Sequence, residues 1–302
     1  MSGTQRITSI RIRHAARGLI PIKTRMTISG DTVHYDLSES HASISSMLNA
    51  GFGGSFAGIV AGTKMQFPDI PLNSGFYRVV TADLGPLGSV VNADWPSPCA
   101  GFCSGPFEKI MSSVFEIWSD IQPDRAMACT FNLEYLLVGG RDQRGEGNPN
   151  FMWYDWMMGG WGGARNGADG YNASAAVFGV QYGTQPFEGQ ERLAPVLTSC
   201  HDLVPDSGGP GKFRGGLGAE KGGKLWASDN TVMSYCCDRE RSVTWGTLGR
   251  PPVDPAWRLA QQGHRERALP GFDLRRGADQ VGRQVHPALG RRGGWPRRSA
   301  AA

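Results

Sequence analysis

A glycine-rich stretch flanked by tryptophans constrains the fold of this chain more than any other feature. Six of the twelve residues from Gly159 to Gly170 are glycine, and Trp153, Trp156 and Trp161 stand beside or among them. Glycine permits positive φ and close backbone approach, whereas flexible linkers lack large apolar side chains. The stretch therefore predicts packed loops that form a ligand wall or a subunit interface.

Residue patterns predict an α+β fold, rich in β-strands, with mixed sheets, few helices and glycine-rich loops. A hairpin is expected over 22–37, with its turn at Ser29-Gly30-Asp31. Helices are expected over 55–65 and 104–121, the second capped by Ser104. Strands do not alternate regularly with helices, which argues against a doubly wound sheet. Further strands are expected over 76–84, 89–93, 126–138, 173–182 and 193–204, with a hairpin around Gly222-Gly223 over 217–234.

The charge composition changes sharply near residue 250. Residues 250–302 hold 11 Arg, no Lys and 4 acidic residues, which leaves 20 basic against 23 acidic residues in 1–249. The mildly acidic larger part does not favour a nucleic-acid partner. We expect a poorly ordered start over 1–20, a folded unit over 21–249 and a disordered tail over 250–302, where apolar burial cannot offset the ordering entropy.

Neither a membrane nor a metal site is indicated by the sequence. No apolar run approaches the roughly 18 residues of a membrane span, and the N-terminus has no hydrophobic signal core, so a cytoplasmic protein is expected. The six cysteines show no paired Cys/His spacing that suits zinc. They are predicted to be buried thiols, and no metal ligands are assigned.

A second glycine-rich loop, DSGGPGKFRGG from Asp206 to Gly216, is the main candidate site. Its glycine amides and two cations could form a nest for a phosphate or carboxylate; the alternative is a tight structural loop with solvated charges. DSGGP also resembles the nucleophile signature of trypsin-like proteases, but no matching histidine motif accompanies it. The candidate anion-binding residues are Ser207, Gly208, Gly209, Gly211 and Asp169, and the candidate catalytic residues are Asp206, Lys212 and Arg214.

Glu188 and Glu191, in FEGQERLAP, are further candidate catalytic residues. They could act as a carboxylate pair, or they could pair with Arg192. The alternative is that both carboxylates are solvated or held in ion pairs without a catalytic role.

Six runs of the sequence together resemble one protein family, the hydantoinase B/oxoprolinase family, over about residues 21–246. This family includes the B subunits of N-methylhydantoinases, the matching half of 5-oxoprolinase, and subunits of acetone and acetophenone carboxylases. The resemblance implies ATP-driven opening of a cyclic amide, or carboxylation of a ketone through a phosphorylated intermediate. The matching runs are FPDIPLNSGFYRVV, GSVVNADWPSP, GGWGGARNGADG, QPFEGQERLAPVL, DSGGPGKFRGGLGAEKGG and NTVMSYCCDRERSVTWG.

The resemblance also implies partners and cofactors outside this chain. An A-type subunit would handle ATP and Mg²⁺, and the chain matches the C-terminal half of a B-type subunit. The missing upstream half would carry a divalent metal, so we expect no cofactor in this chain and no activity from it alone. The alternative is a non-catalytic structural or interface half. One departure is Ser38-Glu39-Ser40, where the family usually has glycine between the serines.

The resemblance ends abruptly near Trp245, and a change of reading frame would explain why. Synonymous codons for VDPAWRLAQQG, read one base later, give SIPHGVWLNKG, a phrase similar to the family's own continuation. The alternative reading persists to about Trp295. We therefore hypothesise a frameshift, which sequencing of the gene tests directly.

Overall fold

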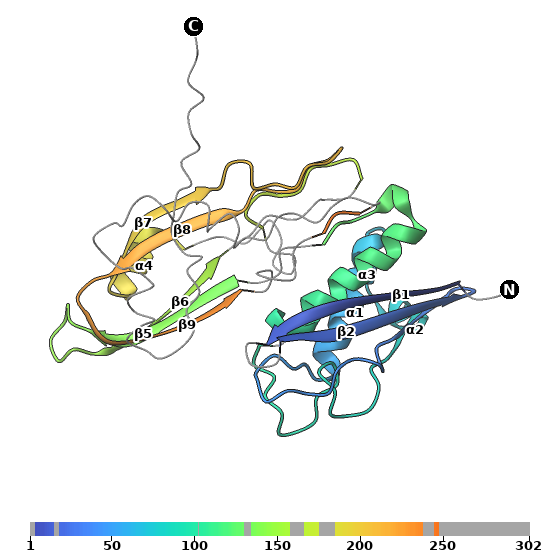
Figure 1. Ribbon diagram of the computed structural model, residues 1–302, viewed down its shortest axis with the longest axis horizontal. Coiled ribbons are helices and arrows are strands. Elements are labelled where there is room, and N and C mark those ends of the chain that lie inside the picture. Colours follow the sequence, from blue (N-terminus) through green and yellow to red (C-terminus); the bar gives the residue numbers. More distant parts are fainter. Residues whose placement is uncertain are drawn as a thin grey trace, which may run out of the picture.

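Two lobes lie side by side in the protein (Figure 1). The computed structural model describes residues 4–14, 18–101, 103–129, 134–157, 166–174, 185–237 and 245–247. The first lobe contains β1–β4 and α1–α3, and the second contains β5–β9 and α4. This arrangement confirms the expected α+β class with few helices and small sheets. The predictions for 158–165, 175–182 and 250–302 lie outside the described residues.

A four-stranded sheet in the order β1-β2-β3-β4 forms one layer of the first lobe. Its first three strands are antiparallel neighbours, whereas β4 lies parallel to β3. Gly30, with φ of 60°, stands in the turn between β2 and β3, so the hairpin predicted over 22–37 is confirmed. The strands are β1 (Thr4–His14), β2 (Gly18–Ser29), β3 (Thr32–Asp36) and β4 (Val80–Asp83).

The structure assigns strand β1 to Thr4–His14, inside the poorly ordered start expected over 1–20. This segment is strand β1 and pairs with β2 along its whole length, from Thr4 opposite Ile28 to His14 opposite Gly18. Pairing with a neighbouring strand satisfies its backbone N–H and C=O groups without helical periodicity. The order Ile-Arg-Ile-Arg over 10–13 already has the two-residue period of a strand.

Two long helices cover the sheet of the first lobe (Figure 1). Helix α1 (Phe52–Gln66) confirms the expected helix at 55–65. Helix α3 (Glu108–Ile121) confirms the second expected helix, and its apolar side chains Ile110, Val114 and Trp118 are buried in the core. Ser104 is not the N-cap, because it lies in a π-helical turn, η1 (Cys103–Phe107), before α3 begins.

The expected strand over 76–84 begins instead as a helix. Helix α2 (Ser74–Val79) precedes β4, because the Asn73 side chain accepts hydrogen bonds from the backbone N–H groups of Gly75 and Phe76, at 2.9 and 3.4 Å. Such a cap satisfies the free amides of a first helical turn. The expected strand over 89–93 is likewise wrong: the only pairing there among the described residues is a bridge between Ala42 and Ser89.

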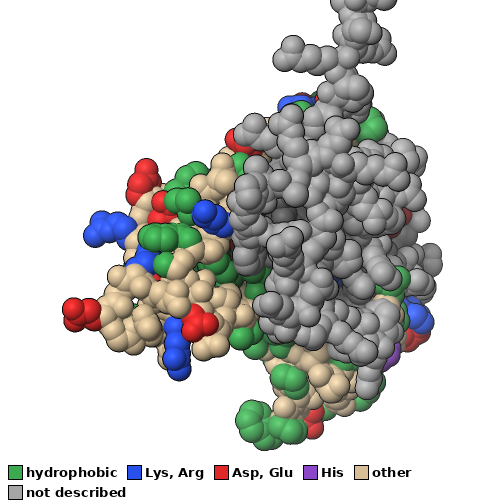
Figure 2. All heavy atoms as spheres, turned by 60° about the vertical axis from the view of Figure 1, so that its left-hand side comes forward, with side chains coloured by type: hydrophobic (Ala, Val, Ile, Leu, Met, Phe, Trp, Pro, Cys, Tyr) green, Lys and Arg blue, Asp and Glu red, His purple; other side chains and the backbone are tan. Residues whose placement is uncertain are grey.

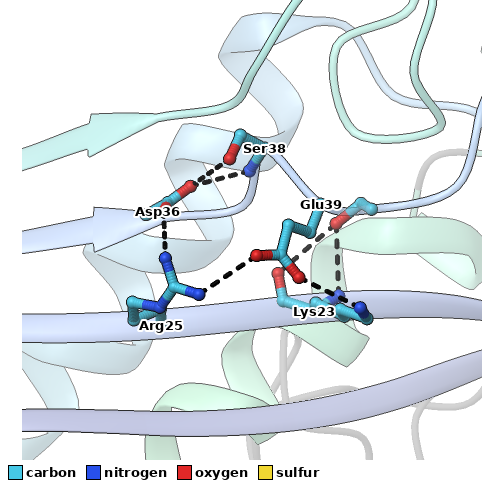
Figure 3. A network of polar contacts seen from close by, with 6 residues as sticks. Lys23, Arg25, Asp36, Ser38 and Glu39 are labelled. Carbon is cyan, nitrogen blue, oxygen red and sulfur yellow. Dashed lines mark hydrogen bonds and ion pairs between the residues drawn. The ribbon is translucent and has the colours of Figure 1, made fainter.

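The Ser38-Glu39-Ser40 loop is anchored by charges to strand β2 (Figure 3). Glu39 pairs with Lys23 at 3.0 Å and with Arg25 at 3.1 Å, and Arg25 also reaches Asp36 at 3.1 Å. The hydrogen bond and charge of Lys23, followed by those of Arg25, lower the pKa of Glu39. Burial opposes ionisation of Asp36, but hydrogen bonds from Ser38 and the charge of Arg25 lower its pKa. Glu39 therefore ties this loop to the sheet.

The second lobe has two antiparallel sheets, in the orders β6-β5-β9 and β7-β8. Figure 1 shows β7-β8 on one side of the three-stranded sheet, with α4 close to both. A short 3₁₀ turn, η2 (Pro123–Arg125), precedes the lobe. The other elements are β5 (Glu134–Asp142), β6 (Asn150–Met157), α4 (Phe187–Leu193), β7 (Val196–Leu203), β8 (Ala219–Leu225) and β9 (Ser228–Cys237).

The strands predicted in the second lobe differ in their outcome. Strand β7 confirms the extended segment expected over 193–204. The strand expected over 126–138 is displaced toward the C-terminus, since β5 spans Glu134–Asp142. Gly222 and Gly223 are not a hairpin turn: they lie inside β8, opposite β7, and β9 then joins the other sheet.

The cysteine thiols are less buried than expected. Cys129 is buried, but Cys99, Cys103 and Cys200 are half-buried.

Candidate functional site

The loop from Asp206 to Gly216 folds back on itself between β7 and β8. The Ser207 hydroxyl donates to the Val204 carbonyl oxygen at 2.7 Å and accepts from the Gly218 N–H at 2.8 Å. Farther along, the Gly215 N–H donates to the Gly209 carbonyl oxygen at 2.8 Å. A Cβ placed on Gly208 would lie 2.4 Å from the Gly215 carbonyl oxygen. The loop is therefore closed tightly by its own backbone.

Asp169 brings the two glycine-rich segments together. Its carboxylate accepts from the Arg214 backbone N–H at 3.0 Å and from the Arg214 Nε at 3.3 Å. The Gly170 N–H donates in turn to the Arg214 carbonyl oxygen at 2.8 Å. Both charged side chains are about half exposed, so this ion pair is screened by water. The backbone bonds fix the register of the two segments.

These contacts limit which groups of the loop can bind an anion. The amides of Arg214 and Gly215 already have partners inside the protein, and the guanidinium of Arg214 is paired with Asp169. Lys212 is exposed, with its ammonium 5.3 Å from the centroid of the Phe213 ring. Asp206 is exposed and has a positive φ of 57°. An anion would therefore meet Lys212 rather than a complete nest of amides.

Glu188 and Glu191 both lie on helix α4. The Glu191 carboxylate accepts from the Thr198 N–H at 2.8 Å, and the Arg144 guanidinium donates to the Glu191 carbonyl oxygen. Glu191 thus connects α4 to β7, while Glu188 is exposed. In the described part of the chain, neither carboxylate forms an ion pair with Arg192.

A buried ion pair that sequence reasoning missed lies between the two sheets of the second lobe. Lys221 of β8 and Asp155 of β6 are 6% and 4% exposed, and their Nζ and Oδ2 atoms are 2.6 Å apart. Lys221 also donates to the Gln190 side-chain oxygen of α4 at 3.1 Å. A buried charge is tolerated only when it is paired in this way. The lysine therefore joins three elements that are distant in sequence.

His201 and two aromatic rings surround this ion pair. His201 is the cross-strand partner of Lys221, and its ring centroid lies 5.8 Å from that of Phe187. The Lys221 ammonium is 5.7 Å from the Phe187 centroid and 6.0 Å from the Trp153 centroid. Burial, followed by the charge of Lys221, lowers the pKa of His201 against the opposing effects of Asp155 and Asp202. We call Trp153, Asp155, Phe187, Gln190, His201 and Lys221 the Lys221 cluster.

The described residues were also compared with what a charged binding surface, a metal site and a membrane-spanning helix require. On the face that Figure 2 presents, basic and acidic side chains of the described residues are interspersed. Within the described ranges, no three His, Cys, Asp or Glu side chains gather closely enough to hold a metal ion. The helices described here are all too short or too polar to cross a membrane.

The chain belongs to the hydantoinase B/oxoprolinase family, whose model matches residues 4–284. The match starts before residue 21 and continues beyond Trp245, where the resemblance was expected to end. The fold is similar to those of two solved structures. The chain superposes on a nucleotide-free acetone carboxylase structure with a TM-score of 0.69 and 19% identity, over 90% of this chain and 39% of that one.

Two further comparisons concern one relative. The chain is 31% identical over 205 residues to the caprolactamase subunit beta of Pseudomonas jessenii, covering 67% of this chain and 35% of the relative. The crystal structure of the ATP-dependent caprolactamase from the same organism matches with a TM-score of 0.68 and 24% identity, over 84% of this chain and 44% of that one. The chain thus spans about a third of the length of the curated relative.

Proposed function

We propose that this chain supplies the C-terminal part of a B-type subunit in an ATP-dependent enzyme that opens cyclic amides. The observation that carries the proposal is the family match over residues 4–284, together with 31% identity to a caprolactamase subunit beta. An A-type subunit would handle ATP and Mg²⁺. A divalent metal would be held by the upstream part of the B-type subunit, as the family resemblance implies.

The contribution of this chain would be to bind and orient rather than to activate ATP. The sequence has no GxxxxGK[ST] phosphate loop. The second lobe offers two polar sites instead: the loop with exposed Lys212, and the Lys221 cluster. Binding groups that hold a substrate near a reactive centre lower the entropic part of the barrier. The protein would act in the cytoplasm with its partner subunits.

A ketone carboxylase is the second candidate function. It is favoured by 28% identity over 92 residues to the acetone carboxylase alpha subunit of Xanthobacter autotrophicus. The similarity covers 30% of this chain and 12% of that relative, which is less than the caprolactamase match covers. A non-catalytic interface half remains the alternative role in either enzyme.

The test is reconstitution of the complete complex. The chain is co-expressed with the upstream part of a B-type subunit and an A-type subunit, and ATP turnover is measured with caprolactam, hydantoin and 5-oxoproline. We expect ATP consumption coupled to ring opening. ATP consumption only with acetone or acetophenone and bicarbonate would replace hydrolysis with carboxylation. Ring opening by the purified chain alone would contradict the proposed division of labour.

The reading-frame hypothesis adds a control to this experiment. The arginine-rich composition of 250–302 supports it, since 11 Arg occur there without a single Lys. A version of the chain continued in the alternative frame after about Trp245 is compared with the present one. Greater recovery of complex with the continued version is expected, and an intact gene without that alternative reading would end the hypothesis.

A further inference from the structure

We propose that an exposed apolar surface on helices α1 and α2 is the docking site for the upstream part of the B-type subunit. We call it the α1–α2 surface, and its members are Phe52, Phe56, Ile70, Leu72 and Tyr77. It belongs to the first lobe, whereas the two polar sites described above belong to the second. The proposal rests on the proposed function in one respect, that the chain is part of a longer B-type subunit.

Aromatic rings form a continuous part of this surface. Phe52 and Phe56 stack one helical turn apart on α1, with ring centroids 5.6 Å apart, and the Phe56 ring lies 6.3 Å from that of Tyr77 on α2. Phe52 is 56% exposed and Tyr77 is 45% exposed. Aromatic side chains are enriched at the centres of protein interfaces, where they serve as anchors. The helices therefore present a ready set of anchors to a partner.

The segment that leads into α2 adds exposed aliphatic side chains, Ile70 and Leu72. The Lys64 ammonium at the end of α1 donates to the carbonyl oxygens of Phe67 and Pro68, at 3.2 and 2.7 Å. It also donates to the Ile70 carbonyl oxygen, and so holds this segment against the helix. Lys64 is the only charged residue in the sequence of α1, and its charge is used within the lobe. The surface therefore suits an apolar partner.

The length of the relatives indicates what covers the surface. The chain spans 35% of the caprolactamase subunit beta and 39% of the acetone carboxylase chain on which it superposes. More than half of each relative is therefore additional to the matched part. Exposure of clustered apolar side chains to water is unfavourable, so such a surface is typical of a contact with another part of the protein. The additional part of the B-type subunit is the nearest source of such a contact.

Chain that precedes Thr4 in a longer subunit would enter at the end of the sheet where α2 lies. One row across the sheet contains, as successive cross-strand partners, Thr4, Ile28, Val33 and Val80. Helix α2 ends at Val79, immediately before this row. Figure 1 likewise shows the start of β1 at the same end of the sheet as α2. The upstream part can therefore reach the surface without a long connection.

The size of the surface argues against a second copy of the chain as its occupant. A stable interface between separate molecules buries about 800 Å² per partner and involves roughly 20–30 residues on each side. The α1–α2 surface draws its apolar members from two short segments only. A covalently connected part needs less area, because the connection gives it a high effective concentration at the surface.

The test compares the 302-residue chain with a hybrid that contains an upstream part. In the hybrid, this chain replaces the segment that it matches in the caprolactamase subunit beta of Pseudomonas jessenii. Hydroxyl-radical labelling followed by mass spectrometry measures the exposure of Phe52 and Tyr77. We expect both rings to be oxidised about fivefold more slowly in the hybrid, because an interface excludes water and the radical with it. Equal rates in the two proteins would overturn the proposal.

A pair of substitutions tests the same contact through stability. Leu72→Lys places a charge on the surface, so it should leave the urea midpoint of the 302-residue chain unchanged and lower that of the hybrid. The matched control is Leu193→Lys, at a side chain of α4 that is 70% exposed, and it should be neutral in both proteins. Equal effects of Leu72→Lys on the two proteins, or equal effects of the two substitutions on the hybrid, would contradict the proposal.

Two measurements separate the competing occupants. Sedimentation should show that the 302-residue chain is a monomer; a dimer that Leu72→Lys dissociates would assign the surface to a second copy. If labelling of the hybrid slows only after an A-type subunit is added, that subunit is the occupant. Either result would refute the proposal.

One measurement needs no hybrid. Slow labelling of Phe52 and Tyr77 in the 302-residue chain alone would mean that the chain covers the surface itself, and would overturn the proposal even if the hybrid failed to fold. None of these experiments measures ATP turnover. Their failure therefore leaves the proposed ATP-dependent function standing, and failure of the reconstituted enzyme to turn over ATP leaves the docking result standing.

Discussion

Gly62 of α1 meets Val114 of α3 so closely that a Cβ added to the glycine would lie 2.9 Å from the valine Cβ. One turn earlier, a Cβ on Gly58 would lie 2.7 Å from the Phe107 carbonyl oxygen. Residues four apart lie on the same face of a helix, so the two glycines form a contact strip toward α3. The close approach of α1 and α3 therefore depends on the absence of side chains at these positions.

Gly62→Val should destabilise the first lobe by about 1–3 kcal/mol, because the helices must separate to admit the side chain. The free energy of unfolding is measured in urea by tryptophan fluorescence. Gly53→Ala is the matched control in the same helix, since its Cβ would meet nothing within 4 Å. That control should be neutral or stabilising by about 0.5–1 kcal/mol. Equal stability of Gly62→Val and the unaltered chain would show that the helices do not approach this closely.

Tyr35→Phe should destabilise the same lobe through a buried hydrogen-bond chain. The Tyr35 hydroxyl accepts from the Trp118 indole at 2.9 Å and bonds the Thr63 hydroxyl at 2.8 Å. Removing it leaves a buried indole N–H without a partner, which costs about 1–3 kcal/mol. Urea unfolding measures the loss. Tyr77→Phe, at a tyrosine 45% exposed, should change stability little, and a similar loss there would contradict the explanation.

The pH dependence of stability gives an independent test of Tyr35. Burial raises its pKa to about 12 from 10.0, although hydrogen bonds from Thr63 and Trp118 act the other way. The folded state therefore keeps this proton at a pH where the unfolded chain has lost it. Its contribution is fully present below pH 10 and is lost as pH rises through about 12, on the order of 2–3 kcal/mol. The difference in unfolding free energy between the unaltered chain and Tyr35→Phe should shrink across this window; a constant difference would refute the burial argument.

How far the fold follows from the sequence differs between elements. The hairpin of β2 and β3 and helices α1 and α3 were predictable, because turn residues or an apolar stripe mark them locally. Strand β1 was hidden by its arginines, although 10–13 alternate as a strand does. Helix α2 overlaps the strand expected over 76–84, and its N-cap, Asn73, lies before that segment. In each case a local signal existed and another feature masked it.

The candidate site shows a different limit of prediction from sequence, because its contacts join residues that are distant along the chain. Asp206 to Gly216 could be recognised as a loop from its glycines, but its pairing with Asp169 joins residues 45 positions apart. The Lys221 cluster could not be found at all from spacing. It requires β8 to pair with β7 and not with β9, and it requires β6 to direct Asp155 toward that sheet. In the sequence alone, a lysine that becomes buried cannot be told from an exposed one, because its burial depends on how the sheets pack.

Gly208→Ala should destabilise the second lobe, because its Cβ would lie 2.4 Å from the Gly215 carbonyl oxygen. Backbone cannot yield as a flexible side chain does, so we expect a loss of about 1–3 kcal/mol. Gly218→Ala is the control, since its Cβ would only touch the Ser207 hydroxyl oxygen at 3.7 Å. Urea unfolding followed by tryptophan fluorescence compares the two. An unchanged Gly208→Ala variant would mean that the loop is open and not closed on itself.

The last prediction concerns the charges of the same loop in the reconstituted complex. If the loop contacts an anionic substrate group or intermediate, replacing Lys212 by Gln and Arg214 by Met should lower turnover tenfold or more, equivalent to about 1.4 kcal/mol of transition-state stabilisation. The structure allows the two charges to be separated. Arg214 is paired with Asp169, whereas Lys212 is exposed, so Lys212→Gln alone should account for most of the loss.

Two control variants distinguish a role of the Lys212 charge in turnover from a structural role of the loop. Lys224→Gln removes an exposed lysine from neighbouring β8 and should leave turnover unchanged. Asp169→Asn weakens the tie to Arg214 without touching Lys212, and should affect stability more than turnover. If the double replacement leaves turnover intact while Gly208→Ala unfolds the lobe, the loop is structural: its glycines then matter because they permit closure, and its cations are merely solvated.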